Sequence, residues 1–233
     1  MHDLRIGGFT PFTTLDFPDR LAAIVFCQGC PWRCDYCHNQ PLQPGKGRTA
    51  GPAWERVEAM LTQRRGLLDG VVFSGGEPCA QSGLRPALAV VKSMGYATGL
   101  HTAGAYPTRL EAALDTLDWI ALDAKGPLED YATIVHARGA GERFRRSLEI
   151  VLGSGLGYEV RTTLYADATP EKLTRFAGLL AGLGVRHYAW QARRSTDIAG
   201  RPLIEAPPDP GWHQAAATVG PWFESFEFRT GGP

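Results

Sequence analysis

The chain has 233 residues and a formal net charge of zero, with 44% hydrophobic and 21% charged residues, as in ordinary soluble globular proteins. The neutral balance gives no support for nucleic acid or an anionic membrane as a partner. No apolar run is long enough for a membrane span, and the first residues do not form a signal peptide. We therefore expect a cytoplasmic protein that binds neither nucleic acid nor a membrane.

Short apolar runs alternate with amphipathic stretches along most of the chain. The expected strands are 21–26, 70–74, 96–101, 118–124, 158–164 and 186–191. The expected helices are 53–68, 83–94, 108–117, 141–152 and 169–183. This alternation predicts right-handed βα units and a parallel sheet, either doubly wound or curled into a complete or partial barrel. In both architectures the chemistry lies at the C-terminal ends of the strands.

The two ends of the chain fall outside this repeat. Residues 4–14 contain two adjacent glycines and are expected to form a short hairpin before the first strand, while 222–229 reads as an edge strand and 206–211 as a loop. No internal boundary stands out. We expect one domain over 1–233, with its core at about 20–191, an N-terminal hairpin within 1–19 and a C-terminal extension over 192–233.

Polar residues gather on one face of three consecutive expected strands. Because side chains alternate between the faces of a strand, Asp123 and Lys125 share a face, as do Glu159 and Arg161, and Gln191 lies on the polar face of the next strand. Charged groups inside a sheet are costly unless they pair or bind something. They form either an internal ion-pair network or a polar binding cavity, and for the set as a whole we favour the cavity.

Four of the five cysteines, Cys27, Cys30, Cys34 and Cys37, lie close together. Clustered cysteines in a cytoplasmic protein indicate metal or redox ligands. Only three residues separate the two CxxC pairs, fewer than in a zinc ribbon, and the order also differs from that of ferredoxins. The set C-x3-C-x2-C remains, which would bind a [4Fe–4S] cluster and leave one iron open for a substrate or cofactor.

Several motifs resemble those of the radical SAM enzymes, which use S-adenosylmethionine (SAM). CPWRCDYCHN (30–39) resembles their CxxxCxxC loop, and FSGGEP (73–78) is similar to their second motif. Segments of the third to sixth strands also match: HTAG (101–104), LDAKGP (122–127), YEVRTT (158–163) and YAWQ (188–191). The opening GFTPFTTLDFPDRLAAIVFCQGC resembles the start of glycyl-radical-enzyme activating proteins, most of all those of anaerobic ribonucleoside-triphosphate reductase.

This resemblance implies an α/β fold, a partial (β/α)6 TIM-like barrel with short N- and C-terminal extensions. Cys30, Cys34 and Cys37 would ligate three irons of a [4Fe–4S] cluster, and SAM would chelate the fourth. The implied SAM contacts are Tyr36, Ser74, Gly75, Gly76, Glu77, Thr102, Asp123, Lys125, Arg161 and Gln191. Such an oxidoreductase would cleave SAM reductively to a 5′-deoxyadenosyl radical, which abstracts hydrogen from a glycine of a partner glycyl-radical enzyme. Anaerobic ribonucleotide reductase is the expected partner, and flavodoxin or ferredoxin the expected electron donor.

Some features of the sequence depart from the family pattern. Related activating enzymes commonly carry aspartate where this chain has His101, so we expect no cation beside the cofactor and interpret His101 as a hydrogen-bonded strand-end residue. Cys79 is interpreted as a small semi-buried thiol and Cys27 as an apolar position at the end of a strand, with a redox-active pair as the sharper alternative. Two other functions stay open: radical SAM chemistry on a small molecule, as in deazaguanine synthases, and a non-catalytic iron–sulfur or zinc module.

Overall fold

The computed structural model describes residues 4–46, 51–165, 167–193 and 211–230. One sheet joins its strands in chain order. The strands are β1 (Ile6–Thr13), β2 (Ala22–Cys27), β3 (Gly70–Gly75), β4 (Ala97–Thr102), β5 (Trp119–Asp123), β6 (Gly157–Thr163), β7 (His187–Gln191) and β8 (Ser225–Arg229). The α-helices are α1 (Trp54–Gln63), α2 (Leu84–Ser93), α3 (Pro107–Glu111), α4 (Tyr131–Val135), α5 (Ala140–Gly153), α6 (Pro170–Gly182) and α7 (Gly211–Val219). Short 3-10 helices are η1 (Gln40–Leu42), η2 (Pro78–Ala80), η3 (Leu114–Thr116) and η4 (Gly220–Trp222).

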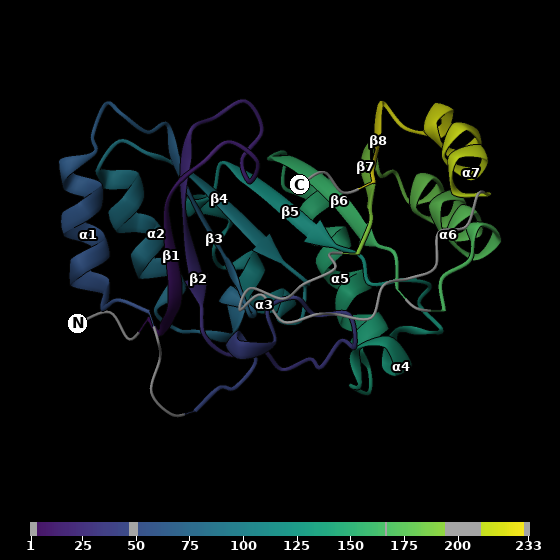
Figure 1. Ribbon diagram of the computed structural model, residues 1–233, viewed down its shortest axis with the longest axis horizontal. Helices are drawn as coiled ribbons and strands as arrows, with labels where there is room; N and C mark the ends of the chain where they lie inside the picture. The colour runs from purple at the N-terminus through teal and green to yellow at the C-terminus, as the bar shows by residue number, and fades with distance from the viewer. Residues whose placement is uncertain (1–3, 47–50, 166, 194–210, 231–233) are drawn as a thin grey trace.

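The sheet is an open partial barrel. Strand β1 is antiparallel to β2, and every later pair of neighbours is parallel. Among the described residues, β1 and β8 are its two edges. Figure 1 shows the strands fanning from β1 to β8, with α1 and α2 beside the first strands and α6 and α7 beside the last. The expected α/β class and partial barrel are confirmed, and the parallel strands bring their C-terminal ends to one side.

All six expected inner strands and the five expected helical stretches are present. The stretch 108–117 forms α3 and then a tighter 3-10 turn, η3, in which Thr116 Oγ1 donates to the carbonyl of Ala113. The edge strand expected in 222–229 is β8. Helices α4 and α7 were not expected, and α7 begins at Gly211, the last residue of the expected loop, whose other residues lie outside the described ones.

The N-terminal segment corrects one prediction. Residues 4–14 do not form a hairpin of their own, because β1 pairs with β2 over its whole length, from Ile6 opposite Cys27 to Thr13 opposite Ala22. The adjacent glycines therefore sit inside a strand rather than in a turn. A Cβ at Gly7 would lie 2.3 Å from Leu42 Cδ2 and 2.6 Å from Gln28 Oε1. A side chain at Gly7 would therefore have to displace the ends of the Leu42 and Gln28 side chains, because the loop after β2 packs against this strand.

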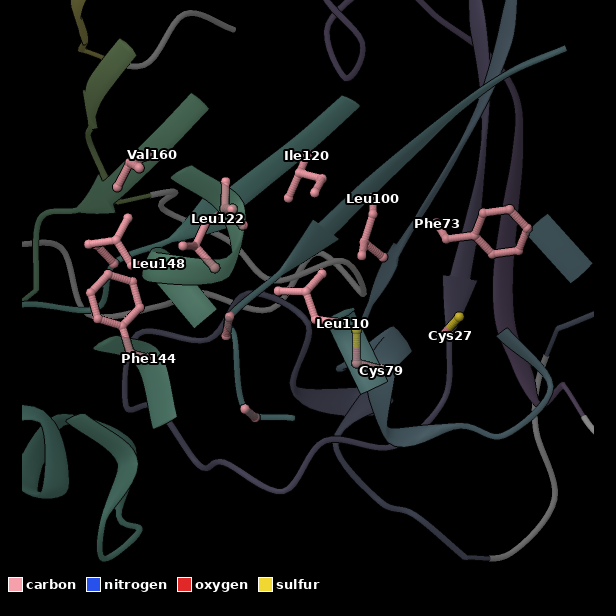
Figure 2. Close-up of a cluster of buried hydrophobic side chains, with 14 of the residues drawn as sticks. Cys27, Phe73, Cys79, Leu100, Leu110, Ile120, Leu122, Phe144, Leu148 and Val160 are labelled. Atoms are coloured by element: carbon pink, nitrogen blue, oxygen red, sulfur yellow. The ribbon is translucent and has the colours of Figure 1, made fainter. Parts of the chain in front are cut away.

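The sheet buries apolar side chains on both faces. The outer face and the helices share the large core, part of which Figure 2 shows with Phe73, Leu100 and Leu122 from successive strands. The inner face has a small core of its own, in which Phe17 from the β1–β2 connection stacks on Trp119 with ring centroids 5.7 Å apart. A Cβ at Gly70 would lie 2.9 Å from the Phe17 ring. The connection therefore fills the barrel interior near the N-terminal ends of the strands.

Replacement of Phe17 is expected to destabilise the fold. Phe17→Ala removes a ring that is 3% exposed, so we expect a loss of about 3–5 kcal/mol in the free energy of unfolding, measured by urea denaturation. Phe12→Ala is the matched control, because Phe12 is 53% exposed and its loss should change stability by no more than about 0.5 kcal/mol. Equal losses for the two variants would contradict the assignment of Phe17 to a core.

Candidate active site

The cysteine loop follows β2 and is held mainly by backbone hydrogen bonds. Gly29 N donates to the carbonyl of Leu42 at 2.7 Å, and Cys30 N donates to that of Gln43 at 3.0 Å. Further along, Cys37 N donates to the Cys34 carbonyl at 3.1 Å. Such bonds satisfy the polar groups of an irregular backbone. Cys30, Cys34 and Cys37 are all partly exposed free thiols on this loop, so one irregular segment presents the three predicted ligands.

Helix α4, which sequence reasoning missed, supports the same loop. Arg33 N donates to the Val135 carbonyl at 2.9 Å, and His136 Nε2 lies 2.9 Å from Asp35 Oδ1. Trp32 is 1% exposed and meets Tyr131 edge-on at 5.9 Å between ring centroids. The apolar residues of α4 at i, i+3 and i+4, beginning at Tyr131, were the available signal, but a helix this short is easily overlooked.

Gly75 and Gly76 bring the end of β3 against the cysteine loop. Gly76 N donates to the Cys27 carbonyl at 2.9 Å, and Asn39 Nδ2 donates to the Gly75 carbonyl at 3.0 Å. Gly75 has a φ of 106°, which residues with a side chain rarely adopt. A Cβ at Gly76 would lie 2.4 Å from the Gly29 carbonyl oxygen. Any side chain at Gly76 would therefore separate the two loops.

Glu77 is fully buried and its carboxylate is used within the protein. It accepts hydrogen bonds from Thr102 Oγ1 at 2.7 Å, Ala103 N at 2.9 Å and Cys79 N at 3.0 Å. Burial raises the pKa of Glu77, and the hydrogen bonds from Thr102 and Ala103 act in the opposite direction. The carboxylate thus links the loops that follow β3 and β4, and both Glu77 and Thr102 serve this link.

The polar inner face is present as the alternation predicts. Asp123 Oδ2 lies 3.2 Å from Lys125 Nζ, and Asp123 Oδ1 lies 3.0 Å from Arg161 Nη2. Burial favours a neutral Asp123, but Lys125 and Arg161 lower its pKa well below the ordinary range. Burial likewise opposes a charged Lys125, yet the Asp123 carboxylate raises the pKa of Lys125 well above its usual value. One carboxylate therefore holds two cations at the C-terminal ends of β5 and β6.

Glu159 is not part of this cluster. It pairs instead with Arg229 of β8 through two bonds, from Nη1 to Oε1 at 2.9 Å and from Nη2 to Oε2 at 2.8 Å. Arg229 also lies 2.6 Å from Glu227. Sequence reasoning missed Arg229, although Ser225, Glu227 and Arg229 alternate with aromatic residues in the expected edge strand. The predicted internal ion-pair network is therefore present for Asp123, Lys125 and Arg161. Glu159 also forms an ion pair, but its partner is Arg229 and not a member of that network.

The remaining predicted residues lie around this cluster. The Lys125 ammonium stands 5.8 Å from the centre of the Tyr36 ring, which places the end of β5 beside the cysteine loop. Gln191 Nε2 donates to Thr163 Oγ1 at 3.0 Å. Ser74 Oγ lies 3.4 Å from His101 Nδ1. Residues from β3 to β7 are thus brought to the same side of the sheet.

His101 is a hydrogen-bonded strand-end residue, as predicted. Its Nε2 lies 2.8 Å from the Asp16 carbonyl, and because a carbonyl only accepts, Nε2 carries the proton. His101 also meets Trp119 edge-on, with ring centroids 5.7 Å apart. Burial lowers the pKa of His101 from 6.5 to about 3, and Arg161 acts in the same direction. This neutral ring ties the β1–β2 connection to the end of β4.

The cysteine loop contains groups that suit a bound cluster. Trp32 Nε1 and Tyr36 Oη are buried and have no partner among the described residues. Unpaired buried donors are rare, and sulfur atoms of a cluster accept hydrogen bonds that tune its potential. In the described part of the chain, no three ligand side chains converge on one point as a single metal ion requires. Thiolates that bind separate irons of one cluster have no such requirement, so the loop fits the group.

Cys27 and Cys79 are buried thiols. They are 0% and 1% exposed, and Figure 2 shows both among apolar side chains, with Leu110 beside Cys79. Burial raises the pKa of each thiol, and the Glu77 carboxylate raises it further. Reactive cysteines need an accessible thiolate, so these observations favour the structural reading over a redox-active pair.

Sequence comparisons with known proteins identify one family, and structural comparisons show the same fold. The model of the radical SAM superfamily matches residues 24–180. A pyruvate formate-lyase-activating enzyme of Clostridium pasteurianum is 33% identical over 178 residues, which cover 72% of this chain and 71% of the relative. Streptococcus suis SuiB, solved with its precursor peptide SuiA, superposes with a TM-score of 0.70 at 14% identity over 89% of this chain. The protein anSMEcpe, solved with bound AdoMet, superposes with a TM-score of 0.55 at 15% identity over 72% of this chain. This chain covers 48% and 49% of those two chains, about half their length.

The neutral His101 predicts a dependence of stability on pH. The pKa of His101 is lower in the folded than in the unfolded protein. Protonation of His101 therefore favours the unfolded state, so the free energy of unfolding is unaffected above about pH 6.5 and decreases as the pH falls towards about 3. We expect the neutral His101 to lower the free energy of unfolding by about 2 kcal/mol at about pH 5, relative to about pH 7. Urea unfolding at about pH 7 and about pH 5 should show a smaller loss for His101→Gln than for wild type. His213→Gln, on an exposed residue of α7, should behave like wild type, and parallel losses in all three proteins would refute the expectation.

Proposed function

We propose that this chain, which belongs to the radical SAM superfamily among its glycyl-radical-enzyme activating enzymes, activates anaerobic ribonucleotide reductase. Its cofactors are a [4Fe–4S] cluster and SAM. The observation that carries the site is the three-cysteine loop bound through Gly76 to the end of β3, with Asp123, Lys125 and Arg161 alongside. We treat residues 1–233 as one domain and expect the electron to come from flavodoxin or ferredoxin.

We assign cluster ligation to Cys30, Cys34 and Cys37. When bound, the cluster would supply the electron for reductive cleavage of the C5′–S bond of SAM, which is the source of the 5′-deoxyadenosyl radical. The chain's own part is to hold and orient the cofactor and exclude water. Burial raises the pKa of the Cys30 thiol to about 12, with Glu77 adding to the effect, and ligation requires the deprotonated thiolate.

The SAM site would occupy the polar inner face beside this loop. Gly75 and Gly76 expose backbone that a ligand can approach closely, and Glu77 with Thr102 holds that backbone in place. Ser74 would line the same side. Tyr36 would lie beside the adenine, while Asp123, Lys125 and Arg161 supply fixed charges around the ribose and carboxylate. Gln191, at the end of β7, would border the far side of the cofactor.

A protein substrate suits the open shape of the sheet. Strands β1 and β8 do not pair with each other in the described residues, so the barrel is incomplete and a partner's loop can approach from outside. The partner's glycine Cα must reach the radical, and a folded loop needs more room than a small molecule does. The choice of ribonucleotide reductase over pyruvate formate-lyase rests on the N-terminal segment that begins at Gly7.

The ligand assignment predicts a sharp division among the cysteines. Cys30→Ala, Cys34→Ala and Cys37→Ala should each lose the cluster after anaerobic reconstitution, because each removes one of three thiolates. Cys27→Ser should retain it, and Cys79→Ser is the second control. Absorbance, bound iron and 5′-deoxyadenosine released with dithionite are measured. If the Cys27→Ser variant loses the cluster while one of the three alanine variants retains it, the assignment of Cys30, Cys34 and Cys37 as the ligands is wrong.

The substrate assignment predicts a radical on the partner. The reduced, SAM-loaded enzyme is incubated without oxygen with anaerobic ribonucleotide reductase, and separately with pyruvate formate-lyase. We expect a glycyl-radical signal by electron paramagnetic resonance on the first and at least about tenfold less on the second, a difference of about 1.4 kcal/mol in transition-state binding. Cleavage of SAM with no glycyl radical on either partner would support a small-molecule substrate instead.

A further inference from the structure

Helix α4 carries a tyrosine whose hydroxyl group is bonded inside the candidate site. Tyr131 is fully buried, and its Oη accepts a hydrogen bond from the backbone N of Lys125 at 2.8 Å. Lys125 is one of the residues assigned to SAM binding, whereas Tyr131 is neither a predicted cluster ligand nor a predicted SAM contact. The hydroxyl therefore has a partner in the site but no role assigned to it there.

This hydrogen bond lies at the point where the chain leaves the sheet. Just before it, Ala124 N still donates to a neighbouring strand, at 2.8 Å from the Arg161 carbonyl oxygen of β6. At the next residue, the backbone N of Lys125 donates to the Tyr131 side chain instead. A partly buried N–H group needs an acceptor. The Tyr131 hydroxyl therefore takes over from the sheet in holding the backbone of Lys125.

The Tyr131 ring is itself held from two sides. It stacks on Phe144 of α5 with ring centroids 5.1 Å apart, and it meets Trp32 of the cysteine loop edge-on at 5.9 Å. Phe144 and Trp32 are buried as well, and aromatic pairs of both geometries are favourable. The position of the hydroxyl is therefore determined by core packing, independently of the bond to Lys125.

Lys125 is connected to the cysteine loop by two routes. Its ammonium lies 5.8 Å from the centre of the Tyr36 ring, and Asp123 Oδ2 lies 3.2 Å from the same Nζ. Its backbone is connected through Tyr131 to Trp32. The cysteine loop thus contacts the side chain of Lys125 through one aromatic residue and supports its backbone through two others. These contacts fix where the ammonium stands relative to the loop that carries the predicted ligands.

We propose that Tyr131 is a positioning residue, which sets the place of the Lys125 ammonium for SAM through its hydrogen bond to the Lys125 backbone. The inference rests on the proposed function, because it assumes that Lys125 binds SAM. Without the hydroxyl, the N–H of Lys125 would lose its acceptor, which costs free energy. The backbone would shift to find another acceptor and carry the ammonium with it. Small displacements of a group that holds a substrate have large effects.

The test is the affinity of the reconstituted enzyme for SAM when Tyr131→Phe removes only the hydroxyl. Both ring contacts persist in this variant, so bound iron and cluster absorbance should match wild type. We expect the dissociation constant for SAM to rise about tenfold, measured by anaerobic calorimetry on the oxidised cluster, which consumes no SAM. In SAM cleavage driven by dithionite, the KM for SAM should rise about as much, while kcat at saturating SAM changes by less than about twofold.

Tyr96→Phe is the matched control. Tyr96 is also buried, and its hydroxyl also bonds to the backbone, donating to the Leu61 carbonyl at 2.6 Å outside the site. Each variant loses one hydroxyl that bonds to the backbone, so urea unfolding should show a similar loss of stability in both. The affinity of Tyr96→Phe for SAM should equal that of wild type, because Lys125 keeps its acceptor.

Three results would overturn the role of Tyr131. The first is wild-type affinity for SAM in Tyr131→Phe. The second is an equal loss of affinity in Tyr96→Phe, since the effect would then follow from stability alone. The third is a loss of bound iron in Tyr131→Phe only, because the hydroxyl would then support the cluster rather than Lys125. Failure of the proposed function is distinct: wild type would bind and cleave no SAM, or would cleave it without forming a glycyl radical, and the second case leaves the role of Tyr131 intact.

Discussion

The close backbone contact at Gly76 is the constraint on which the site depends. Two loops that follow neighbouring strands meet there, and a Cβ at Gly76 would come within 2.4 Å of the Gly29 carbonyl oxygen. With glycine in place, Gly76 N reaches the Cys27 carbonyl and Glu77 N reaches the Gly29 carbonyl, each at 2.9 Å. The cysteine loop has little regular structure of its own, so these bonds and those from η1 determine its position.

The charged residues of the inner face lie on the same side of the sheet as the cysteine loop. Among the described residues, Asp123 is the carboxylate shared by Lys125 and Arg161, and removing it would leave two largely covered cations without this partner. Breaking a buried pair from one side is far more costly than omitting it. Glu159 and Arg229 form a second charge pair closer to the sheet edge. There, Arg229 of β8 extends across β7 to the Glu159 carboxylate on β6. This pair fastens the edge strand to the barrel interior.

The sequence predicted the strands and their two faces, because apolar runs and alternation depend on neighbouring residues alone. It also placed Asp123, Lys125 and Arg161 correctly on one face. It did not predict which groups would pair, since alternation identifies a face but not a partner from another strand. Glu159 therefore found an unexpected partner in Arg229. Likewise, the residues next to β1 in the sequence do not show that this strand pairs with β2. They also do not show that the Phe17 ring packs in the barrel interior, in the space beside Gly70.

Glu77 illustrates how a motif residue can serve the site without facing it. The resemblance to radical SAM enzymes implies that Glu77 is one of the SAM contacts. The structure gives that carboxylate three donors from the protein, and Thr102 Oγ1 is itself fixed by accepting from Gly104 N at 3.0 Å. A buried network whose members are all paired is rigid. Glu77 and Thr102 therefore act on this side of the sheet by holding the Gly75–Gly76 backbone in place.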